Sequence, residues 1–572
     1  MVMLLVVTPF AGALVCTLLR GRAVALAGRL TALATLAVTT WFVSRGGNAS
    51  GLDHRLGGWG QPLGIEVHAD GLSLIFLLLT SLTGAMVSLY AGSYFTARTE
   101  TSSAGNHFWP LWLFLWGGLH GLYLSSDVFN LYVLLEVASL SSVALATLSR
   151  RSAALSASLR YLLAAMVGSL VFLLGVTFLY ASHGVLDIRP LGEAAAPTLP
   201  VIIAFGLMLF GLLIKTALLP FHFWLPPAHG NAAAPVSAIL SALVIKGAYY
   251  LVLRIWFGVF PGLVTFPAAQ FLGALGALAI VWGSLQAIRQ KRLKLLVAHS
   301  TVSQIGYLFL LFPLTAPSGI AGQARDWELQ AWTGGICQVF AHGVAKAALF
   351  MAVGNIIYAL GTDRISSLHL IAGRMPLTTF TLGLAGVSLM GLPPSGGFVA
   401  KWMTLNAILA SGQWWWVPVI VAGGLLTAGY VFLILGHAFR PPGRPHDLIP
   451  VPKVMEITAL LLAFTALIMA LVSVYRLRSR HSASTDTSFW ALAALLHASL
   501  GALWLSTDLF NWYICLELLA LVSVALVTLA GPRAWRPAMN YLLLSLVASL
   551  FYLLGVALFY GRYGMLDIVQ AS

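Results

Sequence analysis

The chain has 572 residues, of which 59% are hydrophobic and only 8% are charged, and its formal net charge is +14. Soluble globular chains have roughly 25% charged residues, so the composition excludes a soluble fold and indicates an integral membrane protein. The excess of basic residues does not indicate nucleic-acid binding, because these residues lie mostly in short loops between apolar segments.

Apolar windows predict the membrane spans. A spanning helix needs about 20 mostly apolar residues, and windows of that length predict about 17 spans. In chain order they lie near residues 2–19, 27–43, 70–95, 108–124, 128–148, 159–180, 200–219, 235–255, 265–287, 297–313, 334–360, 376–410 (broken), 415–437, 454–475, 488–505, 510–530 and 538–560. We expect the first span to be retained as an anchor, because it has no polar, small-residue cleavage site.

The basic loops predict the orientation of the chain. Clusters of basic residues follow the odd-numbered spans, whereas the other loops are poorer in them or balanced by acids. The positive-inside rule therefore places these clusters in the cytoplasm and the N-terminus outside, in a multi-pass protein of the inner cell membrane. The clusters are Arg20, Arg22 and Arg29; Arg150, Arg151 and Arg160; Arg289, Lys291, Arg292 and Lys294; Arg364 and Arg374; and Arg440, Arg444 and Lys453.

The sequence has no motif for cofactor-dependent catalysis. Cys16, Cys337 and Cys515 lie far apart without a CxxC spacing, which argues against iron–sulfur ligation and against a disulfide framework. There is no phosphate-binding loop and no GxGxxG fingerprint after a strand. We therefore expect no cofactor, no metal site and no catalytic residue, and a transporter rather than an enzyme acting by itself.

The charged residues inside the predicted spans are of few kinds. Nearly all of the 17 acidic residues lie in loops or at span ends, and only Glu136 and Glu517 lie well inside a predicted helix. Almost no arginine lies deep in a span, whereas four of the seven lysines do. These four are Lys215, Lys246, Lys346 and Lys401.

This division predicts a series of proton-exchanging groups. Arginine keeps its charge at any accessible pH, whereas a lysine removed from water can release its proton. A buried charge costs at least about 2.5–3.5 kcal/mol on insertion scales, so a buried ionisable residue indicates function. The alternative interpretation is that these side chains snorkel to the membrane surface or form structural ion pairs.

Two predicted helices are interrupted by prolines beside a buried lysine. Lys215 lies five residues before Pro220, and two prolines precede Lys401 in LMGLPPSGGFVAKWM. Such breaks need cover from protein or a water-filled cavity, and broken helices commonly mark ion sites in transporters. The alternative is a kink that only shapes packing. The prolines at the breaks are Pro220, Pro226 and Pro235 in the first and Pro393 and Pro394 in the second.

Histidines extend the predicted path. His342 and Lys346 are four residues apart and therefore share one helix face. His299 lies in the AHSTVSQIGY segment, and His222 and His229 flank the first break as possible accessory groups. Histidine titrates near neutral pH and suits a proton shuttle, although a lone histidine in a membrane is more often a packing residue.

Five segments together resemble one family, over roughly residues 1–475. DVFNLYVLLEVASLSS, LLPFHFWLPPAHGNAAAPVSAILSALVIKGAYYLVLR, RQKRLKLLVAHSTVSQIGYL, AHGVAKAALF and GLPPSGGFVAKW resemble the antiporter-like proton-translocating family. This family includes the large membrane-arm subunits of NADH:quinone oxidoreductase (complex I), subunits of membrane-bound hydrogenases and the large subunits of Mrp-type sodium/proton antiporters. The second segment is most similar to the D-type large subunit of the Mrp antiporters.

The resemblance implies the fold. We expect an all-α polytopic membrane protein of about 14 helices, with two inverted five-helix repeats and two broken helices, followed here by about three extra C-terminal helices. The expected parts are 1–107 with helices 1–3, 108–255 with the first repeat (helices 4–8), 256–438 with the second repeat (helices 9–13), 439–487 with helix 14 and a linker, and 488–572 with a partial copy of helices 4–6.

The resemblance also implies a role for each matched position. Glu136 and Lys215 are expected to form a switching ion pair, and Lys246 is expected to be the central group. The remaining matches are His299, His342 and Lys346 at the polar positions of helices ten and eleven, and Lys401 at the exit half-channel. The implied mechanism is a horizontal relay, in which a proton on one lysine weakens its neighbour's hold on a proton.

The C-terminal part departs from this family. Residues 490–568 align with 109–188 with one deletion, so that Glu517 repeats Glu136. The copy has no lysine and is not expected to form a second complete channel. Glu517 either faces a lysine of a neighbouring subunit or belongs to a remnant that packs as structure. The basic segment 475–488 lies outside if 14 spans precede it, so either the span count is off by one or the copy is inverted.

Several functions stay open at this stage. The preferred one is Mrp-type monovalent cation/proton antiport by a proton-translocating subunit of a complex with other membrane subunits. The alternative is a proton-pumping subunit of a complex I-like NADH:quinone oxidoreductase or of a membrane-bound hydrogenase, with the redox centres on partners. A non-transporting scaffold and a carrier that works alone are further classes. The sequence does not identify the transported cation.

Overall fold

The computed structural model describes residues 2–45, 52–55, 66–96, 102–316, 326–369, 371–440, 448–478, 509–528 and 537–541, with single positions at 58, 64 and between 545 and 558. The chain forms two compact units, Met1–Ser473 and Val474–Ser572. The expected span at 488–505 and most of the linker before it lie outside the described residues.

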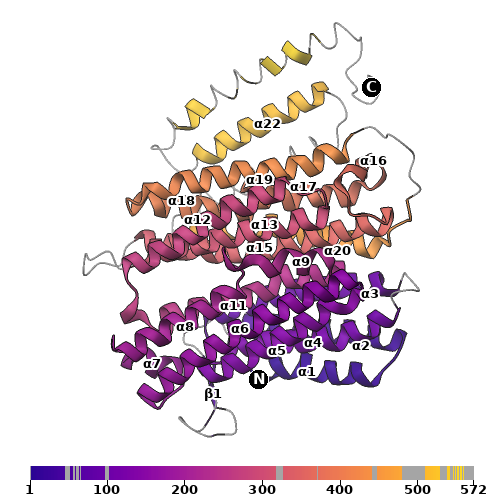
Figure 1. Ribbon diagram of the computed structural model, residues 1–572. Helices are drawn as coiled ribbons and strands as arrows, with labels where there is room; N and C mark the ends of the chain where they lie inside the picture. The colour runs from indigo at the N-terminus through magenta and orange to yellow at the C-terminus, as the bar shows by residue number, and fades with distance from the viewer. Residues whose placement is uncertain are drawn as a thin grey trace. The chain divides into compact units, whose positions relative to one another are not determined.

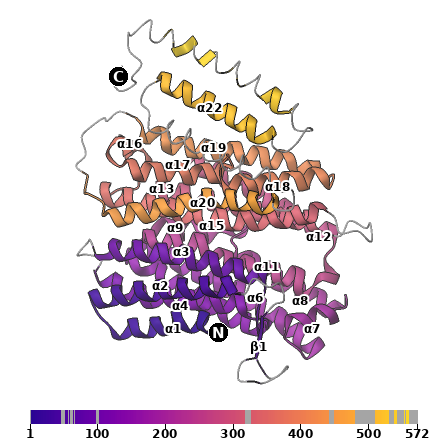
Figure 2. The same ribbon diagram turned by 180° about the vertical axis from the view of Figure 1, so that it is seen from behind.

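The first half of the first unit contains long apolar helices that run side by side (Figures 1 and 2). They are α1 (Met3–Leu18), α2 (Arg22–Arg45), α3 (Gly71–Thr96), α4 (Ser102–Leu124), α5 (Val128–Ala146), α6 (Ser152–His183), the short α7 (Ile188–Ala194), α8 (Leu199–Lys215), α9 (Leu225–Asn231), α10 (Ala234–Ile239) and α11 (Ile245–Arg254).

The second half of this unit continues the same arrangement, and Figure 1 shows it in magenta to orange. Its helices are α12 (Phe266–Ile288), α13 (Leu293–Phe309), α14 (Leu311–Thr315), α15 (Asp326–Leu360), α16 (Ile371–Arg374), α17 (Pro376–Met390), α18 (Gly396–Ala410), α19 (Val417–Ala438) and α20 (Lys453–Arg478). Nine helical segments of the described residues are long and apolar enough to cross a membrane. The chain is an all-α, multi-pass membrane protein.

A small β-hairpin lies between α2 and α3, where the sequence indicated only a loop. Strands β1 (Leu52–Arg55) and β2 (Glu66–Ala69) pair antiparallel. The hairpin is attached to the α4–α5 connection, because Ser126 Oγ donates to the Glu66 carbonyl at 2.8 Å. Strands of four residues are too short to be detected by apolar windows of about 20 residues.

The first helix break follows Lys215, the last residue of α8. The Ile214 carbonyl at this helix end accepts a hydrogen bond from Trp224 Nε1 at 2.9 Å and another from the Ala217 amide at 3.1 Å, so it is satisfied although the regular helix stops here. Pro226 and Pro235 lie in the first turns of α9 and α10, where a missing backbone N–H leaves no bond unmade. These prolines therefore start helices rather than distort them.

The second break lies between α17 and α18. Helix α17 ends at Gly391, which has φ of +82°, a left-handed conformation that favours glycine. Pro393 and Pro394 lie in the connection, and α18 begins after Ser395, whose Oγ accepts a hydrogen bond from the Phe398 amide at 3.1 Å. Each broken helix packs along a long one: α8 along α6, and α17 and α18 along α15.

The second unit contains α22 (Leu509–Thr528), which agrees with the expected span at 510–530. This helix carries Glu517, whose side chain is half-buried within the described residues.

Candidate proton path

Glu136 and Lys215 form an ion pair between α5 and the end of α8. Lys215 Nζ lies 3.3 Å from Glu136 Oε1 and donates to Ser139 Oγ at 2.7 Å. Ser169 on α6 donates a hydrogen bond to the same carboxylate oxygen. Only 4% of the Lys215 side chain is exposed, against 23% for Glu136. The ammonium is therefore held by one full charge and one hydroxyl in an otherwise apolar setting.

Two glycines bring α6 and α8 close enough for this arrangement. A Cβ on Gly168 would lie 2.8 Å from the Gly211 carbonyl and 3.1 Å from Lys215 Cγ. Real side-chain carbons do not approach a backbone oxygen so closely, so an alanine would force the helices apart. The close contact of α6 and α8 thus positions Lys215.

A small cavity lies next to Lys215. It has a volume of about 20 Å³ and is lined by Lys215 and Ser139 and, from the π-turn and α11, by Val244, Gly247 and Ala248. A cavity of about 10–15 Å³ suffices for one water molecule if polar partners are present. Among the described residues no hydrogen bond joins Lys215 to Lys246, and the cavity reaches the backbone next to Lys246 at Gly247.

Lys246 is fully buried in the middle of the unit. Its Nζ donates to the Ser241 carbonyl at 2.5 Å, and Ser241 Oγ lies 3.0 Å from Thr301 Oγ1 on α13. The backbone between Ser241 and Lys246 contains a π-helical turn, Leu240–Val244, a departure from α-geometry that is frequent at functional sites.

Lys346 on α15 contacts α13, the helix that carries Thr301. It is fully buried, donates to the Val297 carbonyl at 3.1 Å and also donates to Ser300 Oγ. Ser300 is the neighbour of Thr301, so adjacent side chains of α13 connect the surroundings of Lys246 with those of Lys346.

Lys401 lies at the second helix break. Its Nζ donates to the carbonyls of Leu389 and Met390 at 2.8 and 2.9 Å and lies 4.4 Å from the centre of the Tyr307 ring. Gln304 on α13 donates to the same Leu389 carbonyl at 3.3 Å. The end of α17 therefore supplies the oxygens that hold this ammonium, and α13 extends the line of polar groups to it.

The four lysines differ in their charge partners. Lys215 has a carboxylate, whereas within the described ranges Lys246, Lys346 and Lys401 form no ion pair and are held by carbonyls, hydroxyls and a ring. Buried cations without a counter-charge are costly and tend to lose their protons. The three amines can thus alternate between charged and neutral forms without breaking an ion pair.

His342 lies among Lys246, Lys346 and Lys401, close enough for their charges to act on it. It is buried, and both ring nitrogens are without a hydrogen-bond partner in the described structure. An imidazole with two uncommitted nitrogens can accept a proton at one and give it up at the other.

His299, which was expected on the path, and the accessory His222 and His229 lie near this line but not in one cluster. His229 is fully buried, stacks on Phe350 with ring centroids 5.3 Å apart and lies near Lys294 and Lys346. His222 and His299 lie within electrostatic range of each other. Within the described residues, no group of three or more His, Cys, Asp or Glu could hold a metal ion.

Lys294 is a buried amine that sequence reasoning assigned to a basic loop. Helix α13 begins at Leu293, four residues before the expected span, so Lys294 lies in its first turn, 6% exposed, and donates to the Ala232 carbonyl. Its surroundings include Asp363, which accepts a hydrogen bond from Arg292 Nε at 2.8 Å. This lysine therefore extends the line from His229 towards the Arg292–Asp363 pair.

The hydroxyl and amide groups between the lysines were also missed. For three of them the signal was the run of polar residues in the otherwise apolar HSTVSQIGY segment: Ser300 binds Lys346, Thr301 contacts Ser241, and Gln304 shares the Leu389 carbonyl with Lys401. The missed groups are Ser139, Ser169, Ser241, Ser300, Thr301 and Gln304.

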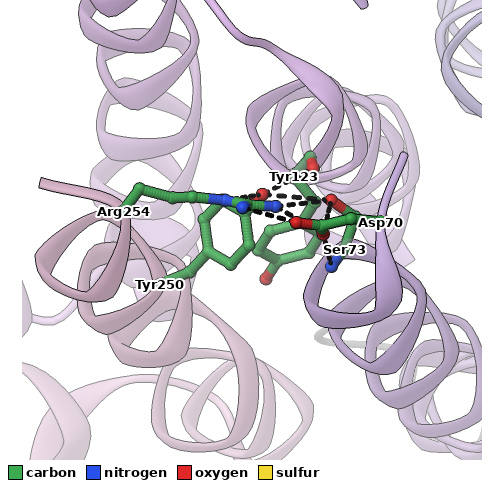
Figure 3. A network of polar contacts seen from close by, with 5 residues as sticks. All are labelled: Asp70, Ser73, Tyr123, Tyr250 and Arg254. Atoms are coloured by element: carbon green, nitrogen blue, oxygen red, sulfur yellow. Dashed lines mark hydrogen bonds and ion pairs between the residues drawn. The ribbon is translucent and has the colours of Figure 1, made fainter. Parts of the chain in front are cut away.

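A second, partly buried ion pair joins Asp70, before α3, to Arg254 at the end of α11 (Figure 3). Two guanidinium nitrogens donate to the two carboxylate oxygens, both at 2.6 Å. Burial alone would raise the pKa of Asp70, but the hydrogen bonds and charge of Arg254, with hydrogen bonds from Ser73, outweigh it and lower that pKa below its usual range. The sequence placed Arg254 near a span end and gave it no partner.

The copied helix in the second unit retains only part of the Glu136 site. The sequence keeps the carboxylate as Glu517, but Ala520 replaces Ser139, the hydroxyl that binds Lys215. Ala548 replaces Gly168, at which a Cβ would meet Lys215 and the α8 backbone. The two lost residues are those that contact Lys215 and α8, the helix that ends at Lys215.

The comparisons with known proteins agree with one another. A family described as "NADH:quinone oxidoreductase/Mrp antiporter, TM" matches residues 125–427, more than half of the chain. NADH-quinone oxidoreductase subunit N of Desulforudis audaxviator (strain MP104C) is 34% identical over 433 residues, 72% of this chain and 83% of that protein.

Two further relatives come from antiporters. The D-type subunit of the Na(+)/H(+) antiporter of Bacillus subtilis (strain 168) is 29% identical over 392 residues, 67% of this chain and 75% of that protein. A chain of the Mrp complex from Dietzia sp. DQ12-45-1b has a TM-score of 0.74 and 26% identity, covering 83% of this chain and 95% of that one. This chain therefore belongs to the transmembrane family of the NADH:quinone oxidoreductase and Mrp antiporter subunits.

Proposed function

We propose that this chain moves protons along its line of buried lysines, as a subunit of a multisubunit membrane complex that exchanges a monovalent cation for protons. The observation that carries the proposal is the series Lys215, Lys246, Lys346 and Lys401, which are buried in one unit and are each held by hydroxyl or carbonyl oxygens. The similarity to subunits of Mrp-type antiporters supports the same function.

The relay works through charge interactions at short range. When Glu136 is close to Lys215, the carboxylate stabilises the ammonium, and the proton stays on Lys215. When the pair separates, that stabilisation is lost and the proton moves through the small cavity towards Lys246. Each newly charged lysine then disfavours charge on the next, so protons leave in turn through His342, Lys346 and Lys401.

The chain is further proposed to lie in the inner cell membrane with its N-terminus outside. The basic connections, such as the one that holds Arg292, then face the cytoplasm, and the β-hairpin faces outward. Two exposed positions test this arrangement. A membrane-impermeant maleimide should label Ala196→Cys on intact cells and should label Lys291→Cys only after permeabilisation. The opposite pattern would reverse the orientation.

A second candidate is a proton-pumping subunit of a redox-driven complex. The observation that favours it is the 34% identity to subunit N of an NADH-quinone oxidoreductase. The two candidates differ in their partners, because a redox-driven pump needs subunits that carry redox centres. Purification of the intact complex should yield small Mrp-type membrane subunits in the first case and redox proteins in the second.

Glu517 is proposed to face a lysine of a neighbouring subunit. Its support is the retained carboxylate in an apolar helix, which needs a positive partner within the membrane. The alternative is a purely structural module, consistent with the replacement of Ser139 and Gly168 by alanines. Unchanged transport in Glu517→Gln would reject the role in transport.

The test of the main proposal replaces Lys246 with methionine, which has a similar length but no proton to exchange. In vesicles that contain the whole complex, cation-driven pH changes should be lost for Lys246→Met. Lys453→Met, at an exposed position at the start of α20, should leave them unchanged. Normal transport by Lys246→Met would support a non-transporting scaffold instead.

A further inference from the structure

A charged cavity opens beside the β-hairpin. It has a volume of about 950 Å³ and is bounded by both strands, the α4–α5 connection, α7 and the end of α11. A cavity of this size with a polar lining holds water. Its charged lining consists of Arg55, Glu66, Asp187, Arg189, Glu193 and Arg254.

Arg254 lines this cavity and is held there by several groups. Besides its two bonds to Asp70, its guanidinium donates to Ser73 Oγ at 2.9 Å and to Tyr250 Oη at 2.8 Å (Figure 3). It also lies 5.0 Å from the centre of the Tyr250 ring. A guanidinium with this many hydrogen bonds is fixed in place and stays charged at any pH.

Three aromatic rings lie directly behind Arg254, and we call them the ring cluster. Phe76 from α3, Tyr123 from α4 and Tyr250 from α11 contact one another, with centroid distances of 5.4 Å, 5.1 Å and 5.1 Å. All three are fully buried. Rings in mutual contact at interior packing density leave no room for water between them.

The ring cluster lies close to the small cavity at Lys215. A Cβ on Gly247 would lie 3.8 Å from Tyr123 Oη and 2.8 Å from Leu119 Cδ2. Gly247 and Leu119 both line the small cavity. Gly247 precedes Arg254 by seven residues, which is about 10 Å of helix rise. Along α11 the two cavities are therefore about two helical turns apart, and Tyr250 of the ring cluster lies between Gly247 and Arg254 on this helix.

We propose that the charged cavity is the outer opening of a proton route to Lys215, and that the ring cluster is its closed gate. Hydroxyl groups lie on both sides of the gate. Ser73 Oγ is 3.2 Å from Tyr250 Oη on the cavity side, and Thr80 Oγ1 is 3.4 Å from Tyr123 Oη on the inner side. When the rings part, these groups bind a file of water molecules that carries protons to Lys215.

The lining of this opening carries both signs of charge, with Glu66, Asp187 and Glu193 beside three arginines, so charge alone does not exclude a cation. The selectivity for protons lies at the ring cluster, because a hydrated metal cation is too large for a single file of water molecules between the rings. A proton needs no such space, because it passes between water molecules and hydroxyl groups. The route thus supplies protons, rather than the exchanged cation, to the first lysine of the path.

The inference rests on the proposed function, and the test separates the two. Phe76→Ala removes one ring of the gate and should raise the passive proton conductance of vesicles containing the whole complex several-fold. The matched control is Phe108→Ala, which truncates an equally buried ring near the opposite end of α4, packed against Phe95 and Trp109. Phe108→Ala should leave the passive proton conductance of the vesicles at the wild-type level.

The conductance must also depend on Lys215. Phe76→Ala combined with Lys215→Met should return the conductance to the wild-type level, because the route ends at this amine. A leak that persists in the double variant, or an equal leak in Phe108→Ala, would overturn the proposal. If Lys215→Met alone transports normally, the proposed function fails. If Lys215→Met abolishes transport but Phe76→Ala does not leak, only the route fails.

A labelling measurement covers the case in which Phe76→Ala assembles poorly. Leu122→Cys places a thiol at the small cavity in a chain whose native cysteines are replaced by serine. A small impermeant thiol reagent added outside should react with Leu122→Cys when Phe76→Ala or the milder Phe76→Leu is also present. It should not react behind the intact ring cluster. Equal labelling with and without the ring substitutions would contradict a gate at this place.

Discussion

Lys215 and Glu136 approach each other to 3.3 Å between α8 and α5, yet the closest contact of the ammonium is the Ser139 hydroxyl at 2.7 Å. The lysine is therefore held by two groups of one helix, of which only one is charged. This arrangement allows Glu136 to move away while Ser139 keeps Lys215 in place, which a switching ion pair requires.

The first prediction separates these two contacts. Glu136→Gln keeps the shape of the side chain but leaves a buried ammonium without its counter-charge, a change that costs roughly 3–5 kcal/mol for a fully buried pair. Transport should fall at least tenfold. Ser139→Ala removes one hydrogen bond to a charged group, worth about 1.5–3 kcal/mol, and should reduce transport less. Cation-driven pH changes in vesicles measure both, and a larger loss in Ser139→Ala would contradict this account.

The second prediction concerns the Asp70–Arg254 pair and pH. The pKa of Asp70 in the folded protein lies below the value of about 3.9 for an unfolded chain. The stabilisation is therefore fully present above pH 4 and is lost only as the pH falls towards the folded value. Asp70→Asn should destabilise the protein by roughly 2–3 kcal/mol, below the 3–5 kcal/mol of a fully buried pair, because 31% of the Asp70 side chain is exposed.

Thermal melting of the solubilised complex between pH 3 and pH 9 measures this effect. The difference between wild type and Asp70→Asn should be constant from pH 5 upwards and should shrink only below about pH 4. A difference that changes between pH 6 and pH 8 would assign the effect to another group.

The third prediction compares Gly168, at the α6–α8 contact, with Gly206, an exposed glycine of α8. Gly168→Ala places a Cβ against the Gly211 carbonyl and Lys215, and overpacking of this kind typically costs about 1–3 kcal/mol. Both the melting temperature and transport should decrease. Gly206→Ala on α8 meets no atom within 4 Å and should leave both unchanged. Similar behaviour of the two variants would show that close helix contact at Gly168 does not position Lys215.

Much of the candidate path is visible in the sequence, because its signals are local. A lysine within 20 apolar residues is conspicuous, and prolines beside Lys215 and Lys401 indicate the breaks at which the structure interrupts α8 and separates α17 from α18. Both breaks are in the structure as expected, and an apolar helix, α22, lies where the span at 510–530 was expected. Hydropathy detects these features because membrane burial penalises charge wherever it occurs.

The remaining features depend on contacts between distant segments. Asp70 and Arg254 are 184 residues apart, and no local pattern indicates that they meet. Lys294 was placed in a loop because basic neighbours surround it in sequence, although α13 begins early enough to bury it. The hydroxyl groups of α13 are only weakly polar, so an average hydropathy over a whole span does not reveal them. The contacts that these groups make with the surroundings of the lysines are visible only in the fold.

The central claim is that the buried lysines give up protons during transport, and Lys401 offers the most direct measurement. Lys401→Arg keeps a positive charge near the carbonyls of Leu389 and Met390 and the Tyr307 ring, but arginine does not release its proton in proteins. Cation-driven proton transport by the assembled complex should be lost in Lys401→Arg as completely as in Lys401→Met. Transport that Lys401→Arg preserves and Lys401→Met abolishes would show that this position needs only a fixed charge, and would contradict the relay.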